Sequence, residues 1–335
     1  MTTQQNAGIQ YPSTRTATIL PCPLCGTTGN KLAIYEAGVE RRFGIPVVPV
    51  SDYGQALCRK CGLLYLNSSI SDDYLVKLYS QETLDWQREY TEENTVVWNG
   101  GTSEEESRRF ANVVEVVASF KNVKGVKWLD FGCQTGELGE ICQTRYATTM
   151  YGVEVSEDYA AIADKKWGGG NRVKTSIKPF LEGGQTFDVI SSLETLEHIA
   201  TPWNTVNDLK MAMATDGLLI VTVPSSHYFH LKYFVFKVFR TLFSRKSLQD
   251  RTTSVGRSVF GLCHTHPYNF SPVSLKLMLE RGGFTTIYVG GSGWSERFRV
   301  AAWMARVIAA LTGNRVQIFP SVLAVAKVTK HFNIP

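Results

Sequence analysis

The 335-residue sequence has no run of 18 uncharged apolar residues, so we expect no segment that spans a membrane. Residues Met1 to Ala17 are polar and lack the apolar core of a signal peptide. No internal repeat and no low-complexity tract is present. These absences predict a cytoplasmic protein, with contact at the inner face of a membrane left open.

The excess of positive over negative charge is also small. The net charge of +5 allows an anionic substrate, such as a nucleotide sugar or a phospholipid headgroup, but does not by itself indicate a nucleic-acid partner. Apolar residues make up 44% and charged residues 19%, as in an ordinary globular protein. Seven cysteines, an odd number without an export signal, suggest thiols or metal ligands rather than disulfides.

Four of the cysteines form two Cys-x-x-Cys-Gly knuckles, Cys22-Pro-Leu-Cys25-Gly and Cys58-Arg-Lys-Cys61-Gly. The spacing directs both thiolates of a pair at one tetrahedral ion, and the Gly permits the tight turn. Four free cysteines or a redox pair are the alternatives, but the repeated trailing Gly favours a structural zinc site. The 32 residues between the pairs predict a hairpin-like excursion.

Strand and helix signals alternate from Val126 onward, which predicts a parallel α/β sheet. A helix before it carries an apolar stripe through Phe110, Val113, Val114 and Val117. We predict a mobile tail (1–18), a zinc ribbon (19–70), a helical connecting segment (71–122) and an α/β domain (123–335), with helical insertions at about 225–262 and 292–314. The expected strands are Val126 to Phe131, Met150 to Val155, Phe187 to Leu193, Leu218 to Val223, Thr285 to Val289 and Ser321 to Val328.

The segment from Lys127 to Gly139 is a strand that enters a helix through a glycine turn and carries an acid, Asp130. Phosphate sites of this shape use backbone N–H groups without a carboxylate, so the acid favours a cationic or amine-bearing ligand. The segment resembles motif I (Asp-x-Gly-x-Gly-x-Gly) of class I S-adenosylmethionine-dependent methyltransferases, with Gln134 in place of the middle Gly. The resemblance implies a Rossmann-like seven-stranded sheet.

Three later features fit this family in the expected order. Glu154 ends a strand 18 residues after Gly136, where an acid can bind both ribose hydroxyls. The Leu-Glu-His-Ile element around His198 and the strand ended by Pro224 also match, whereas the acid and the glycine spacing disfavour a dinucleotide dehydrogenase. The predicted cofactor-binding residues are Asp130, Gly132, Gln134, Gly136, Glu154, Val155, Leu193 and Glu194.

Histidine suits the deprotonation of an acceptor because its pKa lies near operating pH. His198 follows the fourth strand of the sheet, where ligands of such folds lie. His266 precedes Asn-Phe-Ser-Pro, in which Ser271 and Pro272 can begin a helix. His264 is a weaker candidate. For His198 and His266 a structural role in a loop or turn is the alternative.

Two stretches, Tyr228 to Phe243 and Phe298 to Leu311, mix aromatic and apolar residues with a few basic ones. A helical lid over the acceptor site is the simpler interpretation. A pair of interfacial helices that rests on a membrane is the alternative.

Zinc-ribbon methyltransferases of this layout resemble enzymes of bacterial surface-polysaccharide and deoxysugar pathways. The resemblance implies O- or C-methylation of a sugar, glycan or related small molecule, with S-adenosylmethionine as cofactor and zinc in a structural role. An RNA methyltransferase whose ribbon grips nucleic acid, or an enzyme for a lipid-linked substrate at a membrane surface, is the alternative. We expect a small-molecule or glycan substrate and no nucleic-acid partner, and the oligomeric state stays open.

Overall fold

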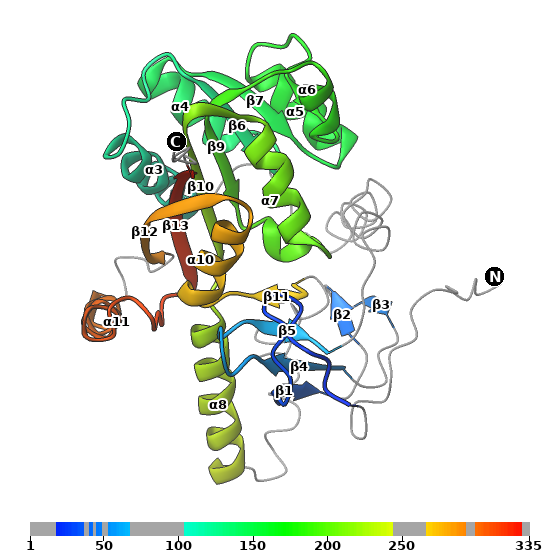
Figure 1. The fold of residues 1–335 in the computed structure, drawn as a ribbon, viewed down its shortest axis with the longest axis vertical. Coiled ribbons are helices and arrows are strands. Elements are labelled where there is room, and N and C mark those ends of the chain that lie inside the picture. The colour runs from blue at the N-terminus through cyan, green and yellow to red at the C-terminus, as the bar shows by residue number, and fades with distance from the viewer. Residues whose placement is uncertain are drawn as a thin grey trace, which may run out of the picture.

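A mixed seven-stranded sheet forms the centre of the protein in the computed structural model (Figure 1). The structure describes residues 18–36, 40–42, 45–48, 53–67, 104–243, 266–292 and 299–329. The strand order across the sheet is β12-β13-β10-β9-β6-β7-β8. The bounds are β6 (Lys127–Phe131), β7 (Thr149–Val153), β8 (Val173–Lys174), β9 (Phe187–Leu193), β10 (Met213–Pro224), β12 (Phe284–Ser292) and β13 (Ser321–Val328).

The expectation of an all-parallel sheet is wrong at one edge. Strands β8, β7, β6, β9 and β10 are parallel, but β13 pairs antiparallel with both β10 and β12. Ser292 at the end of β12 pairs with Ser321 at the start of β13, so the chain returns in the opposite direction. The two-residue strand β8 was too short to give a periodic signal.

Apolar side chains fill both faces of the sheet, which is why its strands are nearly continuous hydrophobic runs. On one face Trp128 and Met150 pack with α3 (Glu104–Ala118), α4 (Glu137–Tyr146) and α5 (Glu157–Lys166). On the other, Leu129 and Ile190 pack with α6 (Lys178–Glu182), α7 (Pro202–Met211) and α10 (Pro272–Arg281). The predicted stripe of α3 is buried at Val113, Val114 and Val117. Helices therefore cover the sheet on both sides.

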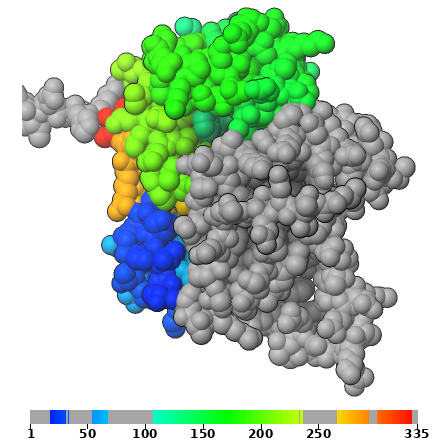
Figure 2. Space-filling model, turned by 90° about the vertical axis from the view of Figure 1, so that its right-hand side faces the viewer, coloured from blue at the N-terminus to red at the C-terminus, as the bar shows by residue number. Residues whose placement is uncertain are grey.

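The cysteine knuckles belong to a second sheet with the order β1-β4-β5-β11. Strands β1 (Lys31–Glu36), β4 (Tyr53–Leu57) and β5 (Leu64–Leu66) come from the N-terminal segment, whereas β11 (Tyr268–Asn269) comes from the C-terminal half of the chain, just before α10. Strands β2 (Glu40–Arg42) and β3 (Ile45–Val48) form the hairpin that the knuckle spacing predicted. Figure 2 shows the N-terminal sheet, in blue, directly against the larger body.

One hydrophobic core joins the two sheets. Leu63 and Tyr65 of the N-terminal sheet belong to the same buried cluster as Phe270, Leu275 and the central strands. The N-terminal sheet and the large sheet therefore share one buried core. The proposed mobile tail, apart from Thr18, and most of the connecting segment lie outside the described residues.

The predicted insertions contain α8 (Ser226–Phe243) and α11 (Arg299–Leu311). Figure 1 shows α8 extending away from the large sheet, beside the N-terminal sheet, rather than folded over the sheet's edge as a lid. Both helices expose apolar side chains, among them Phe234, Val235, Val300 and Trp303. Among the described residues, no helix is long and apolar enough to cross a bilayer.

Candidate active site and cysteine cluster

Asp130 lies inside strand β6 with a fully enclosed carboxylate. Its Oδ1 accepts a hydrogen bond of 2.7 Å from Ser191 Oγ on the neighbouring strand β9, and Ser191 in turn accepts 2.8 Å from Trp128 Nε1. Burial raises the pKa of Asp130 to about 7; the bond from Ser191 opposes the rise, and the charge of Glu154 adds to it. A buried carboxylate of this kind is strongly stabilised by a cationic ligand.

The turn after β6 requires glycine at two positions, because the backbone is left-handed there and is packed closely by neighbouring side chains. Gly132 and Gly136 adopt left-handed φ values of 84° and 88°. A side chain at Gly132 would overlap Thr195, and one at Gly136 would press on the Trp167 ring, whose Nε1 donates to Gly136 O over 2.8 Å. Gln134, where the family has Gly, also takes a left-handed φ of 47° and is exposed, so the departure preserves the turn.

Glu154 follows strand β7 and faces this turn. Its two oxygens accept backbone N–H bonds from Gln134 at 3.0 Å and Ser156 at 2.9 Å. Burial raises the pKa of Glu154, while these N–H donors oppose the rise. Each oxygen keeps a second lone pair that a hydroxyl could use. Val155, the other predicted residue here, is half-buried beside it.

The loop after β9 packs directly on the turn through Thr195. Leu193 ends the strand, and Glu194 adopts a left-handed φ of 51° and is held by its N–H bond to Thr222 O. Burial raises the pKa of Glu194, and the charge of Arg109 opposes the rise. Every predicted cofactor residue therefore lies at the carboxyl ends of β6, β7 or β9, one edge of the sheet.

The two candidate bases meet at the same edge. His198 ends the short 3₁₀ helix Leu196–His198, and His266 precedes β11; their rings contact edge-to-face with 4.5 Å between centroids. His198 Nε2 lies 3.8 Å from Oε1 of Glu197. The third candidate, His264, lies outside the described residues.

Glu197 is a residue to which the sequence analysis gave no role. Its side chain is 0% exposed, and among the residues that the structure describes neither oxygen has a hydrogen-bond partner. Burial, and then the charge of Glu194, raises its pKa well above the usual value. Glu197 is the acid of the Leu-Glu-His-Ile element, in which the sequence pattern indicated a role for the histidine. The site is also supported from inside the core by Ser191, Trp128 and Trp167. In the sequence these residues showed only small or apolar character, which did not indicate this role.

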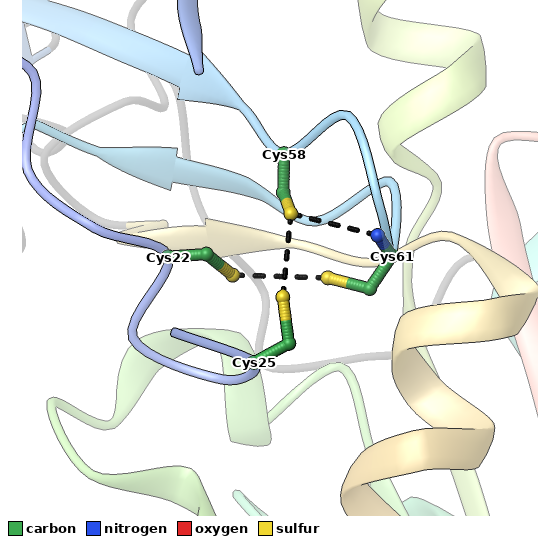
Figure 3. A group of neighbouring side chains, drawn as sticks. All are labelled: Cys22, Cys25, Cys58 and Cys61. Carbon is green, nitrogen blue, oxygen red and sulfur yellow. Dashed lines mark hydrogen bonds between the residues drawn. The ribbon is translucent and has the colours of Figure 1, made fainter. Parts of the chain in front are cut away.

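The four knuckle cysteines converge on one point, as Figure 3 shows. Their sulfur atoms lie within 4.8 Å of one another, with 3.7 Å between Cys22 and Cys61 and 3.4 Å between Cys25 and Cys58. A tetrahedron of thiolates about 2.3 Å from zinc has edges of about 3.8 Å, whereas a disulfide needs about 2.05 Å. A hydrogen bond from Cys61 lowers the pKa of Cys22, which favours the thiolate form that a metal ion binds. The donor set fits a tetrahedral cation.

Residues 104–289, more than half of the chain, match the family described as a methyltransferase domain. The chain belongs to this methyltransferase family. Membership confirms the predicted class I fold, the enzyme class and S-adenosylmethionine as the cofactor of the domain. The acid-bearing turn and Glu154 are the residues that would hold this cofactor.

Two curated relatives are ubiquinone biosynthesis O-methyltransferases. The one from Caulobacter sp. (strain K31) is 31% identical over 103 residues, covering 29% of this chain and 40% of that protein. The one from Actinobacillus pleuropneumoniae serotype 5b (strain L20) is 30% identical over 105 residues, covering 28% and 44%. The match thus spans less than half of either relative.

Solved structures with a similar outline include a magnesium protoporphyrin IX methyltransferase from Synechocystis PCC 6803 with bound SAH. It is 16% identical, with a TM-score of 0.47, and covers 77% of this chain and 99% of that one. A SAM-dependent methyltransferase from Archaeoglobus fulgidus is 18% identical with a TM-score of 0.43, covering 67% and 97%.

Proposed function

We propose that this chain transfers the methyl group of S-adenosylmethionine to an oxygen or carbon atom of a sugar, glycan or related small molecule. The observation that carries the proposal is the meeting of Glu197, His198 and His266 at the loop after β9, whose Thr195 packs on the motif I turn. A general base of this kind is needed when the acceptor must lose a proton before it can attack the methyl group.

The bound cofactor supplies an activated methyl group, and the residues of the chain hold and prepare the reactants. Asp130 and Glu154 bind the amine and ribose ends of the cofactor, and the glycine turn brings backbone against it. One of the two histidines accepts the acceptor's proton. The carboxyl of Glu197, 3.8 Å from His198 Nε2, stabilises the resulting imidazolium, because an adjacent cation offsets the cost of burying a carboxylate.

Other observations support the proposed class of acceptor. The combination of cysteine knuckles and methyltransferase sheet resembles that of deoxysugar and polysaccharide enzymes. The curated relatives, named as O-methyltransferases, support oxygen as the acceptor atom. Exposed Phe234, Val235, Val300 and Trp303 favour, as a second candidate, a lipid-linked acceptor met at a membrane surface. The mild net charge of +5 gives an RNA acceptor the least support.

Zinc is our proposed occupant of the cysteine cluster, in a structural role. Four thiolates leave no open coordination position for a substrate. The cluster also lies in the N-terminal sheet, whereas the acid-bearing turn lies at the edge of the large sheet. Its expected stoichiometry is one zinc ion per chain, measurable by inductively coupled plasma mass spectrometry.

Separate His198→Gln and His266→Gln variants test the proposal. With isotope-labelled S-adenosylmethionine and a small-molecule cell extract, the variant that lacks the base should lose methyl transfer at least 100-fold. Its affinity for S-adenosylhomocysteine, measured by calorimetry, should stay within twofold of the parent. His230→Gln, on α8, is the matched control and should keep full transfer. Normal transfer by both active-site variants would refute a role for this cluster in proton removal.

The same assay separates the acceptor classes. Label in a water-soluble sugar or glycan supports the first candidate, and label in a lipid extract that requires vesicles supports the second. Label in RNA, together with RNA retention that weakens as salt rises, would overturn both.

A further inference from the structure

We infer that the N-terminal zinc ribbon is a positioning element of the acceptor site, with Gln55 and Tyr268 as the residues that transmit its position to His266 and His198. The inference deepens the proposed function and rests on it. Neither residue is offered as a catalytic group. Both act through the backbone that carries the histidines.

The first link joins the ribbon to His266. Ribbon strand β5 pairs antiparallel with β11, with Tyr65 opposite Tyr268 and Leu64 opposite Asn269. The ladder continues at Leu66, whose N–H bonds to Pro267 O at 2.8 Å. One residue further, the side chain of Gln55 on β4 donates from Nε2 to the carbonyl of His266 over 3.2 Å. Gln55 is 1% exposed, so this bond is shielded from water.

The second link joins β11 to the loop that carries His198. The hydroxyl of Tyr268 donates 2.7 Å to the carbonyl of Ala200, two residues beyond His198. Tyr268 is buried, and its ring also packs against Trp203 of α7. The contact between the two histidine rings is therefore braced from both sides, through the backbone of His266 and of Ala200.

The third link fixes the second cysteine knuckle to the same region. Ser271 Oγ, which caps α10 immediately after β11, donates 2.6 Å to Cys61 O, and Ser226 Oγ at the start of α8 donates 2.7 Å to Gly62 O. Gly62 has a left-handed φ of 71°, and a side chain there would meet Ser271. A displaced knuckle would thus pull on Ser271, which follows β11, and on Ser226 at the start of α8.

Strand β11 takes its ladder partner from the ribbon, while Phe270 directly after it forms backbone hydrogen bonds with Pro224 and Ser226. The strand has two residues, and among the described strands its partner in the ladder is β5 alone, at the edge of the ribbon sheet. A strand this short is not stable by itself. The order of the ribbon, which in small thiolate-bound domains depends on the metal, therefore contributes to the order of the histidine segment.

Gln55→Met tests the first link because it keeps the side-chain volume and removes the N–H donor. Asn67→Ser is the matched control: Asn67 is also buried in the ribbon, and its Oδ1 accepts from Leu20 N within the ribbon. Tyr268→Phe tests the second link from outside the ribbon. We would measure zinc content, S-adenosylhomocysteine affinity, carbethoxylation of each histidine by diethyl pyrocarbonate mapped by mass spectrometry, and turnover with the acceptor found in the labelling assay.

For Gln55→Met and Tyr268→Phe we expect the modification rate of His266 or His198 to change at least threefold and kcat to fall at least tenfold. Cofactor affinity and one zinc per chain should be retained, and Asn67→Ser should stay within twofold throughout. If Gln55→Met loses zinc or fails to fold, Tyr268→Phe decides. Unchanged histidine modification in Tyr268→Phe overturns the inference. The modification readout needs no acceptor, so it tests positioning even if no methyl transfer is found.

Discussion

Asp130 shows, at the scale of one residue, that the site is built for a ligand rather than for stability. Its carboxylate is buried, accepts a hydrogen bond from Ser191, and lies near a second acid, Glu154. The rise of its pKa from 3.8 to about 7 corresponds to a cost on the order of 4 kcal/mol for the ionised form. The folded protein therefore holds a proton that the unfolded chain releases, and stability falls as pH rises from about 4 to 7.

The raised pKa of Asp130 predicts that the affinity for a cationic ligand depends on pH. Ligand binding that favours ionised Asp130 should strengthen about tenfold between pH 6 and pH 8, because the ionised fraction rises about tenfold around a pKa of about 7. Asp130→Asn should weaken binding by more than about 1 kcal/mol at pH 8 and remove the pH dependence. Calorimetry with S-adenosylhomocysteine at pH 6, 7 and 8 measures both. An equal slope in the variant would show that another group binds the amine.

At the scale of elements, hydrophobic runs and glycine turns were enough to predict most of the sheet. Strands β9 and β13 have the predicted ends, since long buried runs give a strong signal. The sequence could not reveal that β11 leaves the large domain to join the ribbon, because two residues carry no periodicity and the pairing spans about 200 residues of chain. The same long-range contact hid the roles of Gln55 and Tyr268.

The cap of α10 gives a prediction at this scale. Ser271→Ala removes a capping box and the bond to Cys61, whereas Ser156→Ala removes the cap of α5, which has no ribbon contact in the described structure. Each loss should destabilise folding by about 1 kcal/mol in thermal melts. Release of zinc to a chelator should accelerate in Ser271→Ala alone. Equal release rates in both variants would contradict the coupling of knuckle and helix.

At the scale of the whole molecule, two sheets share one buried core. Leu63 and Tyr65 of the ribbon pack in the cluster that contains Phe270 and Leu275. The acid-bearing turn and Glu154 could be singled out as cofactor-site candidates because they follow a local motif. The acceptor could not, since its surroundings come from segments far apart in the chain.

The shared core predicts how the protein unfolds without metal. Removal of zinc by a chelator should lower Tm in a single calorimetric transition, because loss of the ribbon exposes apolar surface of the large domain. Re-addition of zinc should restore the original transition. A separate low-temperature transition, with the main one unmoved, would mean that the ribbon folds independently.

We propose that this chain moves a methyl group from S-adenosylmethionine to a small molecule through the site at Asp130. The most direct measurement is mass spectrometry of a small-molecule cell extract incubated with the protein and isotope-labelled cofactor, with Asp130→Asn as control. We expect labelled small molecules with the parent protein and at least tenfold less label with the variant at limiting cofactor. Absence of label with the parent protein, or equal label with the variant, would contradict this proposal.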